Sequence, residues 1–305
     1  MTRPQLRLDP AKRLPLLKSH LSQPPAPEPV LPVGKSHTHP SKPSSGTENA
    51  AVYFIGNATI LIEYSGIRIL TDPNFLHAGD HVHLGPGVAT ERLKNPAVEL
   101  DALPSLDVIL LSHYHDDHFD RLVEDALNRK FPIITTPHAK ECLASEPEPF
   151  TNVFAMPGKH VPPGVLSTVS DILGAVPPTN GWMVELGDPV GYRIYISVDT
   201  LFVDELEEIP RWLRGEKVDL MLVHLGGTTI PSPKMPLLMV TMDAAMGVKL
   251  MRLVEPEVTV PVHFDDYSVM VSGLEEFVKE VEKEGLGGKV VCLRRGEEYR
   301  FEVRG

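Results

Sequence analysis

The sequence predicts an α/β protein, because short apolar runs alternate along the chain with amphipathic segments of helical period. The runs 108–111 and 219–224 are typical of buried strands. The segments 204–213 and 273–283 are typical of amphipathic helices. The predicted strands fall into two successive sets, and no segment repeats at the period of a solenoid. Polar and histidine-rich stretches follow several strands directly, which is where open α/β sheets bind their ligands.

The composition is that of a soluble globular protein and excludes several classes. The chain has 305 residues, enough for one large domain or two small ones, with 42% apolar and 23% charged residues. A net charge of −12 argues against nucleic acid as the main ligand. No apolar run approaches the ~20 residues that span a bilayer, and the N-terminus lacks the apolar core of a secretory signal. Cys142 and Cys292 are too few for a disulfide framework. We therefore expect reduced thiols and a cytoplasmic location.

The first 48 residues are predicted to form a disordered, proline-rich tail, and residues 49–305 a single folded domain. Seven prolines between residues 24 and 43 interrupt any period, and aromatic residues are scarce. The first twenty residues carry five basic side chains against one acidic side chain. An organelle transit peptide is the alternative interpretation of this segment.

The domain opens with a predicted antiparallel meander of three strands, 51–55, 59–63 and 67–71. Tight-turn signals separate them, and a proline ends the third strand. A long connection, 74–106, follows and carries three histidines. Loops of this length are often binding loops or lids, so we expect a wall of the substrate site here, with local hydrogen bonding or a third metal site as the alternatives. The three histidines are His77, His81 and His83.

The remaining predicted elements alternate between strands and helices. Asp120 and Thr241 are expected to cap the helices that follow them. Further helices are expected at 121–130, 137–144, 204–213, from 241 onward and at 273–283. Further strands are expected at 108–111, 131–135, 151–155, 165–172, 181–186, 192–198, 219–224, 257–262, 290–293 and 299–303.

The densest chemical signal is the stretch 112–118, Ser-His-Tyr-His-Asp-Asp-His, directly after a predicted buried strand. Imidazole and carboxylate are side chains that bind divalent transition metals. His113 and His115 are one residue apart, so they can face one point on an extended turn, whereas Asp117 and His118 can face a second point. A solvated polar loop is the alternative, but such a cluster has little reason to lie against a hydrophobic strand unless something holds its charge.

The same pattern, a strand followed by a metal-type ligand, recurs later in the chain. His160, Asp199, His224 and His263 each follow a predicted strand. A single histidine of this kind is more often a hydrogen-bonded core residue than a ligand. Together with the 112–118 stretch, however, these residues offer enough donors for two metal ions with a bridging carboxylate and a bridging hydroxide.

With these residues, the chain resembles the metallo-β-lactamase-fold hydrolase superfamily over about residues 50–304. The run His113-x-His115-x-Asp117-His118 matches the motif of that superfamily, and His160, Asp199 and His263 follow in its order and spacing. The resemblance implies a four-layer αβ/βα sandwich in which two mixed sheets face each other. The metals would lie at one edge of the sheets.

The resemblance also implies a role for each residue. Asp72 would orient residues 112–118, the metal loop, by accepting a hydrogen bond from behind the ligands. Nitrogen-rich ligation without cysteine favours two zinc ions, with manganese or iron as alternatives. One metal would be held by His113, His115 and His160, the second by Asp117, His118 and His263, with Asp199 bridging both.

The expected reaction is hydrolysis by a metal-bridging hydroxide. Asp117 would orient the hydroxide or move its proton, and His224 would act as an oxyanion donor or an acid, unless it merely packs under the site. Short motifs resemble the branch of ascorbate-phosphate lactonases and N-acylphosphatidylethanolamine phospholipase D enzymes. This implies a lactone, carboxylic ester or phosphodiester bond in a small or lipid-like substrate. The alternatives are an iron-dependent oxidoreductase, such as a sulfur dioxygenase, and a non-enzymatic binding protein on the same fold.

Overall fold

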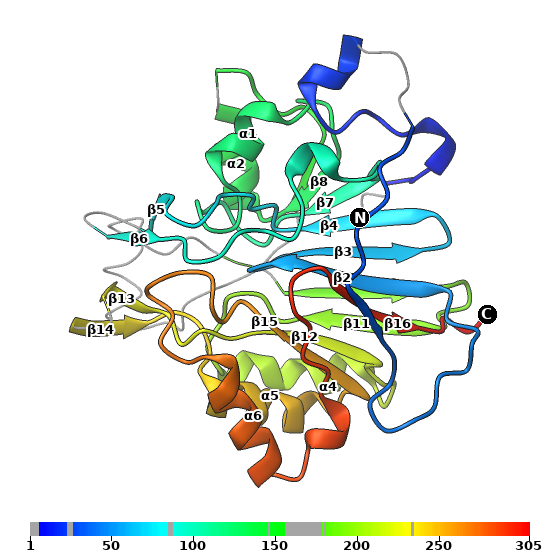
Figure 1. Cartoon of the computed structure of the whole chain (residues 1–305), viewed down its shortest axis with the longest axis vertical. Coiled ribbons are helices and arrows are strands. Elements are labelled where there is room, and N and C mark those ends of the chain that lie inside the picture. Colours follow the sequence, from blue (N-terminus) through cyan, green and yellow to red (C-terminus); the bar gives the residue numbers. More distant parts are fainter. Residues whose placement is uncertain are drawn as a thin grey trace.

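The computed structural model describes residues 6–22, 27–84, 88–145, 147–155, 179, 181–232 and 235–305. Within these ranges two β-sheets lie face to face, and helices cover the outer side of each (Figure 1). This arrangement confirms the predicted α/β class and the four-layer αβ/βα sandwich. None of the helices in the described ranges has both the length and the apolar character that crossing a membrane requires.

The larger sheet has eight strands in the order β1-β16-β2-β3-β4-β7-β8-β9. The predicted meander forms its centre, with β2, β3 and β4 antiparallel. From β4 onward the strands are parallel, so β4 and β7 end at the same edge. The strands are β1 (Lys35–His37), β2 (Ala50–Gly56), β3 (Thr59–Tyr64), β4 (Ile67–Thr71), β7 (Val108–Leu110), β8 (Ile133–Thr135), β9 (Val153–Ala155) and β16 (Glu297–Phe301).

The smaller sheet has four strands in the order β10-β11-β12-β15, and β11, β12 and β15 run parallel. Two hairpins, β5–β6 and β13–β14, project on the side of the molecule away from the C-terminus (Figure 1). The strands are β10 (Trp182–Leu186), β11 (Tyr192–Ile196), β12 (Leu220–His224), β15 (Val258–Val262), β5 (His81–His83), β6 (Ala89–Glu91), β13 (Thr229–Ser232) and β14 (Met235–Met239).

The helices cover the two outer faces of the sandwich (Figure 1). The α-helices on the larger sheet are α1 (Arg121–Ala126) and α2 (Pro137–Ser145), and those on the smaller sheet are α4 (Glu208–Leu213), α5 (Ala244–Val254) and α6 (Leu274–Lys283). Short 3-10 turns are η1 (Pro10–Lys12), η2 (Lys18–Ser22), η3 (Leu100–Ala102), η4 (Asp204–Glu207) and η5 (Gly287–Lys289).

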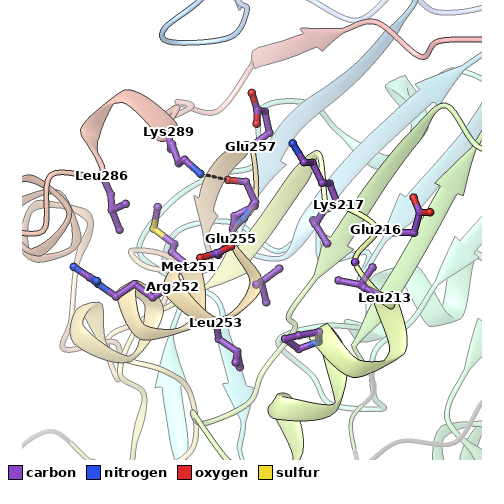
Figure 2. A pocket seen from close by; sticks show the side chains of 15 residues that line it. Leu213, Glu216, Lys217, Met251, Arg252, Leu253, Glu255, Glu257, Leu286 and Lys289 are labelled. Carbon is purple, nitrogen blue, oxygen red and sulfur yellow. Dashed lines mark hydrogen bonds between the residues drawn. The ribbon is translucent and has the colours of Figure 1, made fainter.

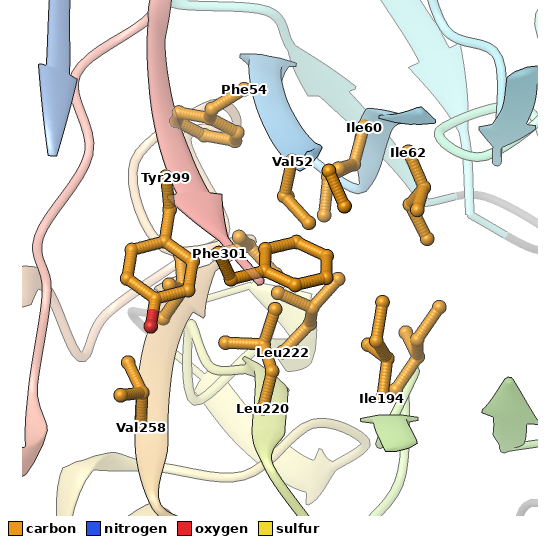
Figure 3. Packing of buried hydrophobic residues seen from close by; sticks show 14 of the residues in the cluster. Val52, Phe54, Ile60, Ile62, Ile194, Leu220, Leu222, Val258, Tyr299 and Phe301 are labelled. Carbon is orange, nitrogen blue, oxygen red and sulfur yellow. The ribbon is translucent and has the colours of Figure 1, made fainter. Parts of the chain in front are cut away.

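Apolar side chains fill the space between the two sheets (Figure 3). Val52 and Ile60 of the meander and Phe301 of β16 face Leu220 and Leu222 of β12, and all five are buried. Burial of this kind contributes about 25 cal/mol per Å² of apolar surface. It fixes the two sheets relative to each other, and with them the strand ends that carry the metal-type residues.

Several element boundaries differ from the prediction. Helix α1 ends at Ala126 rather than residue 130, because Leu127 forms a bridge with Leu17. Asp243 rather than Thr241 caps α5, since its side chain accepts the Met246 N–H. The predicted strand 290–293 is reduced to one bridge, and the predicted strand 165–172 lies outside the described residues.

The N-terminal segment makes contacts that a disordered tail would not make. Strand β1 pairs in parallel with β16. Leu16 and Leu17 are buried in the apolar cluster that includes Val123 of α1, and Arg13 donates two hydrogen bonds to Asp107 at 2.8 and 3.0 Å. The burial of two adjacent leucines stabilises this placement despite the prolines around them. The division of the chain at residue 48 stays a prediction.

Candidate metal centre

Four strand ends bring the metal-type residues together. The loop 112–118 follows β7, Asp199 follows β11 and His263 follows β15, while His224 is the last residue of β12. Because these strands are parallel within each sheet, their carboxyl ends meet at one edge. His118 Nε2 lies 3.1 Å from Asp199 Oδ2, and His263 Nε2 lies 3.6 Å from the same oxygen.

The ligand atoms form two groups that share one aspartate. In each group the atoms all lie within 4.8 Å of one another. Asp117 Oδ1 is 2.6 Å from His115 Nδ1, whereas its Oδ2 is 3.7 Å from His118 Nε2 and 3.8 Å from His263 Nε2. The first group is His113, His115 and Asp117, and the second is Asp117, His118, Asp199 and His263. Asp117 thus presents one oxygen to each group.

The chemistry of the cluster fits a divalent metal. All four residues of the second group are buried. His263 Nε2 and His224 Nε2 are buried and have no hydrogen-bond partner among the described residues. A buried imidazole nitrogen without a partner is unfavourable, and a metal ion beside the carboxylates would satisfy it. Nitrogen and oxygen donors without sulfur are ligands for zinc, manganese or iron.

The charges of the cluster reinforce one another. Burial alone would raise the pKa of Asp117, but His118 and His115 outweigh it and hold that pKa well below its usual range. The pKa of Asp199 is likewise held low against burial by His263 and His118. Burial opposes protonation of His118, yet the two carboxylates raise its pKa well above the usual value. Both carboxylates are therefore ionised, which is the form that binds a metal.

Groups behind the cluster orient the imidazoles. Asp72 Oδ1 accepts the Ser112 N–H at 2.7 Å, and its Oδ2 lies 3.2 Å from His118 Nδ1. Nε2 of His118 is thereby left to face the ligand group. His263 is oriented in the same way, because its Nδ1 lies 3.2 Å from the Leu225 carbonyl. Partners of this kind fix the tautomer of a metal-bound imidazole.

The turns that carry the centre are conformationally strained. Asp72, Val198 and His263 have φ angles of 35°, 52° and 58°. Non-glycine residues rarely adopt positive φ, and such strain clusters at functional sites. One of these turns follows β4 of the larger sheet, and the other two follow β11 and β15 of the smaller sheet. Both sheets therefore place a strained turn at the same edge.

His224 lies against Asp199 at the edge of the second group. Its Nδ1 is 3.2 Å from Asp199 Oδ1, and its ring stacks on that of His263 with 5.5 Å between centroids. Burial lowers the pKa of His224. A carboxylate only accepts hydrogen bonds, so a neutral His224 places its proton on Nδ1 and leaves Nε2 as an acceptor.

The remaining predicted site residues lie elsewhere or outside the described ranges. His160 is not among the described residues. The side chain of His77 is half exposed, and its ring lies 3.0 Å from Glu99. His81 and His83 are exposed on β5, but the His83 N–H donates to Asp116 Oδ2 at 3.2 Å. The β5–β6 hairpin therefore touches the metal loop without adding a ligand to either group.

Sequence reasoning missed the polar residues that hold the metal loop from behind. Asn57 Nδ2 donates to the Asp117 carbonyl at 2.6 Å, and Asn74 Nδ2 donates to the Asp116 carbonyl at 3.0 Å. In the sequence Asn57 belongs to the tight-turn signal between the first two strands of the predicted meander. Its polarity between two apolar strands was the one available signal.

A separate cavity lies at the opposite ends of β12 and β15. It has a volume of about 620 Å³ and is lined by residues of α4, α5 and the following turns, among them Leu213, Met251 and Lys289 (Figure 2). Val218 and Glu257, which precede the two strands, also line it. Because the metal-type residues follow the same strands, this cavity is distinct from the candidate metal centre.

Comparison with known proteins places this geometry in a family. Residues 67–264 match the family described as the β-lactamase superfamily domain. A UPF0173 metal-dependent hydrolase of Archaeoglobus fulgidus is 28% identical over 262 residues, which span 82% of this chain and 98% of that protein.

Two solved structures share the fold. An isothiocyanate hydrolase from Delia radicum gut bacteria has a TM-score of 0.67 at 18% identity. The match covers 83% of this chain and 100% of the hydrolase chain. CmlA, a diiron β-hydroxylase from Streptomyces venezuelae, has a TM-score of 0.51 at 14% identity. The match covers 85% of this chain and 55% of the CmlA chain. The family match spans β4, the metal loop and the turns of Asp199 and His263, and the chain therefore belongs to the β-lactamase superfamily.

Proposed function

We propose that this protein is a metal-dependent hydrolase with two divalent ions, zinc being the first choice. The observation that carries the proposal is the buried cluster in which two carboxylates converge with His263 Nε2, a nitrogen that has no hydrogen-bond partner in the described part of the chain. The name of the Archaeoglobus relative agrees with it. The proposed ligands are His113, His115 and His160 for one ion, and Asp117, His118 and His263 for the other, with Asp199 shared.

The position of Asp117 adds a detail to this assignment. Its two oxygens face the two ligand groups, whereas Asp199 belongs to the second group alone among the described residues. Asp117 is thus placed to hold a water molecule between the groups, orient it and accept its proton. Bound metal ions would supply a hydroxide at neutral pH and polarise the substrate oxygen.

For His224, the contact with Asp199 favours a positioning role over that of an acid. With its proton on Nδ1, the neutral ring has none on Nε2 to give to an oxyanion or a leaving group. A His224→Gln variant tests this, because the glutamine amide can still donate to Asp199. Retained turnover in His224→Gln together with lost turnover in His224→Leu supports positioning, and loss in both supports direct acid catalysis.

The proposed substrate carries an ester-like bond, in a lactone, a carboxylic ester or a phosphodiester, and is small or lipid-like. The short sequence motifs around Asp199 and His263 support this class, and the −12 net charge argues against nucleic acid. The test is initial rates on a lactone panel, p-nitrophenyl acetate and bis(p-nitrophenyl) phosphate, comparing the zinc-loaded protein with Asp199→Ala. Equal rates for both proteins on every substrate would refute the proposal. A cytoplasmic location is part of the same prediction.

An iron-dependent oxidoreductase is the second candidate. Imidazole and carboxylate donors also suit iron, and CmlA, described as a diiron β-hydroxylase, shares the fold. Iron content with oxygen consumption would favour this candidate, and a zinc-loaded active protein would exclude it.

A further inference from the structure

The long connection between β4 and β7 delivers one arginine into the interior. Arg92, directly after β6, and Asp266 are both 0% exposed, with 3.0 Å between Arg92 Nη2 and Asp266 Oδ1. The contact is an ion pair without hydrogen-bond geometry. A buried arginine is uncommon unless its charge is compensated. The residues that contact Arg92 and Asp266 show which part of the fold this ion pair holds in place.

A first chain of hydrogen bonds connects Arg92 to the metal loop through Asn74. Arg92 Nη1 donates to Asn74 Oδ1, which fixes the orientation of the Asn74 amide. Asn74 Nδ2 then donates to the Asp116 carbonyl at 3.0 Å. Tyr267 Oη accepts from Asn74 at 2.9 Å and lies 3.3 Å from Arg92. The amide therefore cannot turn without losing its bonds on both sides.

A second chain of hydrogen bonds connects Asp266 to the loop of Asp117 and to the turn of His263. Asp266 Oδ2 accepts the Asn57 N–H at 2.8 Å and an Arg295 N–H at 2.7 Å. The Asn57 side chain donates to the Asp117 carbonyl at 2.6 Å, and the Asn57 carbonyl accepts the His263 N–H at 3.1 Å. One residue thus joins the loop after β7 to the turn after β15, which lie on different sheets.

We propose that Arg92 and Asp266 are positioning residues that set the separation of Asp117 and His263, and hence the geometry of the second metal group. The inference rests on the proposed function, because it assigns these residues to a metal site. Guanidinium offers five donors in a fixed fork. Arg92 uses them on Asn74, Tyr267, Asp266 and the Lys94 carbonyl at once. Lysine, a compact ammonium, cannot reach all four.

The test replaces Arg92 and measures both the affinity and the geometry of metal binding. The full chain is stripped of metal and titrated with Co²⁺, whose visible absorption reports ligand geometry. We expect Arg92→Lys and Arg92→Met to weaken Co²⁺ binding by about 10- to 100-fold, the range for residues that orient metal ligands. Both should also shift the absorption bands, and the shift should be smaller for Arg92→Lys.

The control is Arg13→Met, which breaks another arginine–aspartate pair. Arg13 pairs with Asp107 just before β7, so the control lies at the opposite end of the strand that precedes the metal loop. It should lower the melting temperature and leave the Co²⁺ spectrum unchanged. If Arg92→Met does not fold, the milder Arg92→Lys decides the question.

The outcomes separate this inference from the proposed function. A folded Arg92→Lys protein with the parent's Co²⁺ affinity and spectrum overturns the positioning role and leaves the proposed function intact. A spectral change in Arg13→Met equal to that in Arg92→Lys also overturns it, because the effect would then be general destabilisation. A parent protein that binds no Co²⁺ refutes the proposed function and this inference together.

Discussion

In the neutral form of His118 that binds a metal, replacing Asp72 with asparagine should move the single ring proton to the wrong nitrogen. In the native protein Asp72 accepts the Ser112 N–H at 2.7 Å and faces His118 Nδ1 at 3.2 Å. An asparagine keeps the first bond only if its carbonyl oxygen faces Ser112. Its NH₂ group then faces His118, and because NH₂ can only donate, Nδ1 must become the acceptor. The ring proton moves to Nε2, the nitrogen that lies 3.1 Å from Asp199 and would bind the metal.

The size of the effect follows from the loss of this one ligand orientation. Changes to the partners of metal-bound imidazoles lower metal affinity by about 10- to 100-fold. At about 1.4 kcal/mol per factor of ten, this is roughly 1.4–2.8 kcal/mol of binding free energy. The assay is competition for Zn²⁺ with a chromophoric chelator at pH 7.5, comparing Asp72→Asn with the parent protein.

Asp107→Asn is the matched control for this experiment. Asp107 is also buried, but it pairs with Arg13 at the opposite end of β7. The control should lower the melting temperature without changing Zn²⁺ affinity. A folded Asp72→Asn protein whose Zn²⁺ dissociation constant stays within twofold of the parent value would refute the assigned tautomer and the orienting role of Asp72.

Three further changes test the centre and the fold around it. Chelation with EDTA should lower the melting temperature, because a metal at 1,000 times its dissociation constant contributes about 4 kcal/mol; an unchanged midpoint in calorimetry would contradict a bound metal. Leu17→Ala should destabilise the protein by about 2–5 kcal/mol in urea unfolding, because Leu17 is only 5% exposed; no effect would mean that the N-terminal segment does not pack on the domain. Gly247→Ala should cost about 1–3 kcal/mol, because its Cβ would lie 2.6 Å from Leu225 Cδ2; a stabilised variant would show that Leu225 can move aside.

Much of the fold was predictable because local patterns reflect it. The meander has turn residues at both corners, and Asn57 and Ser65 there adopt positive φ angles of 52° and 51°. The strands that precede the metal-type residues are short apolar runs, and the match to the β-lactamase superfamily domain confirms the resemblance carried by the metal loop. Periodicity, turn chemistry and a dense motif were sufficient at these positions.

The rest depended on contacts between distant parts of the chain. Arg92 and Asp266 are separated by most of the domain, and nothing local distinguishes a buried arginine from a solvated one. Leu16 and Leu17 are two apolar residues among prolines, too few to show a period, yet both are buried. The cap of α5 was misplaced because Thr241 and Asp243 are both good capping residues, and only the tertiary structure selects Asp243.

The most direct test of a two-metal hydrolase is metal content measured together with turnover. The protein, purified without added metal, is analysed by mass spectrometry and assayed on the ester, lactone and phosphodiester panel beside Asp199→Ala. The account predicts about two zinc ions per chain and hydrolysis of one substrate class, with both metal and turnover lost in Asp199→Ala. Iron with no hydrolysis, or turnover that survives Asp199→Ala, would contradict it.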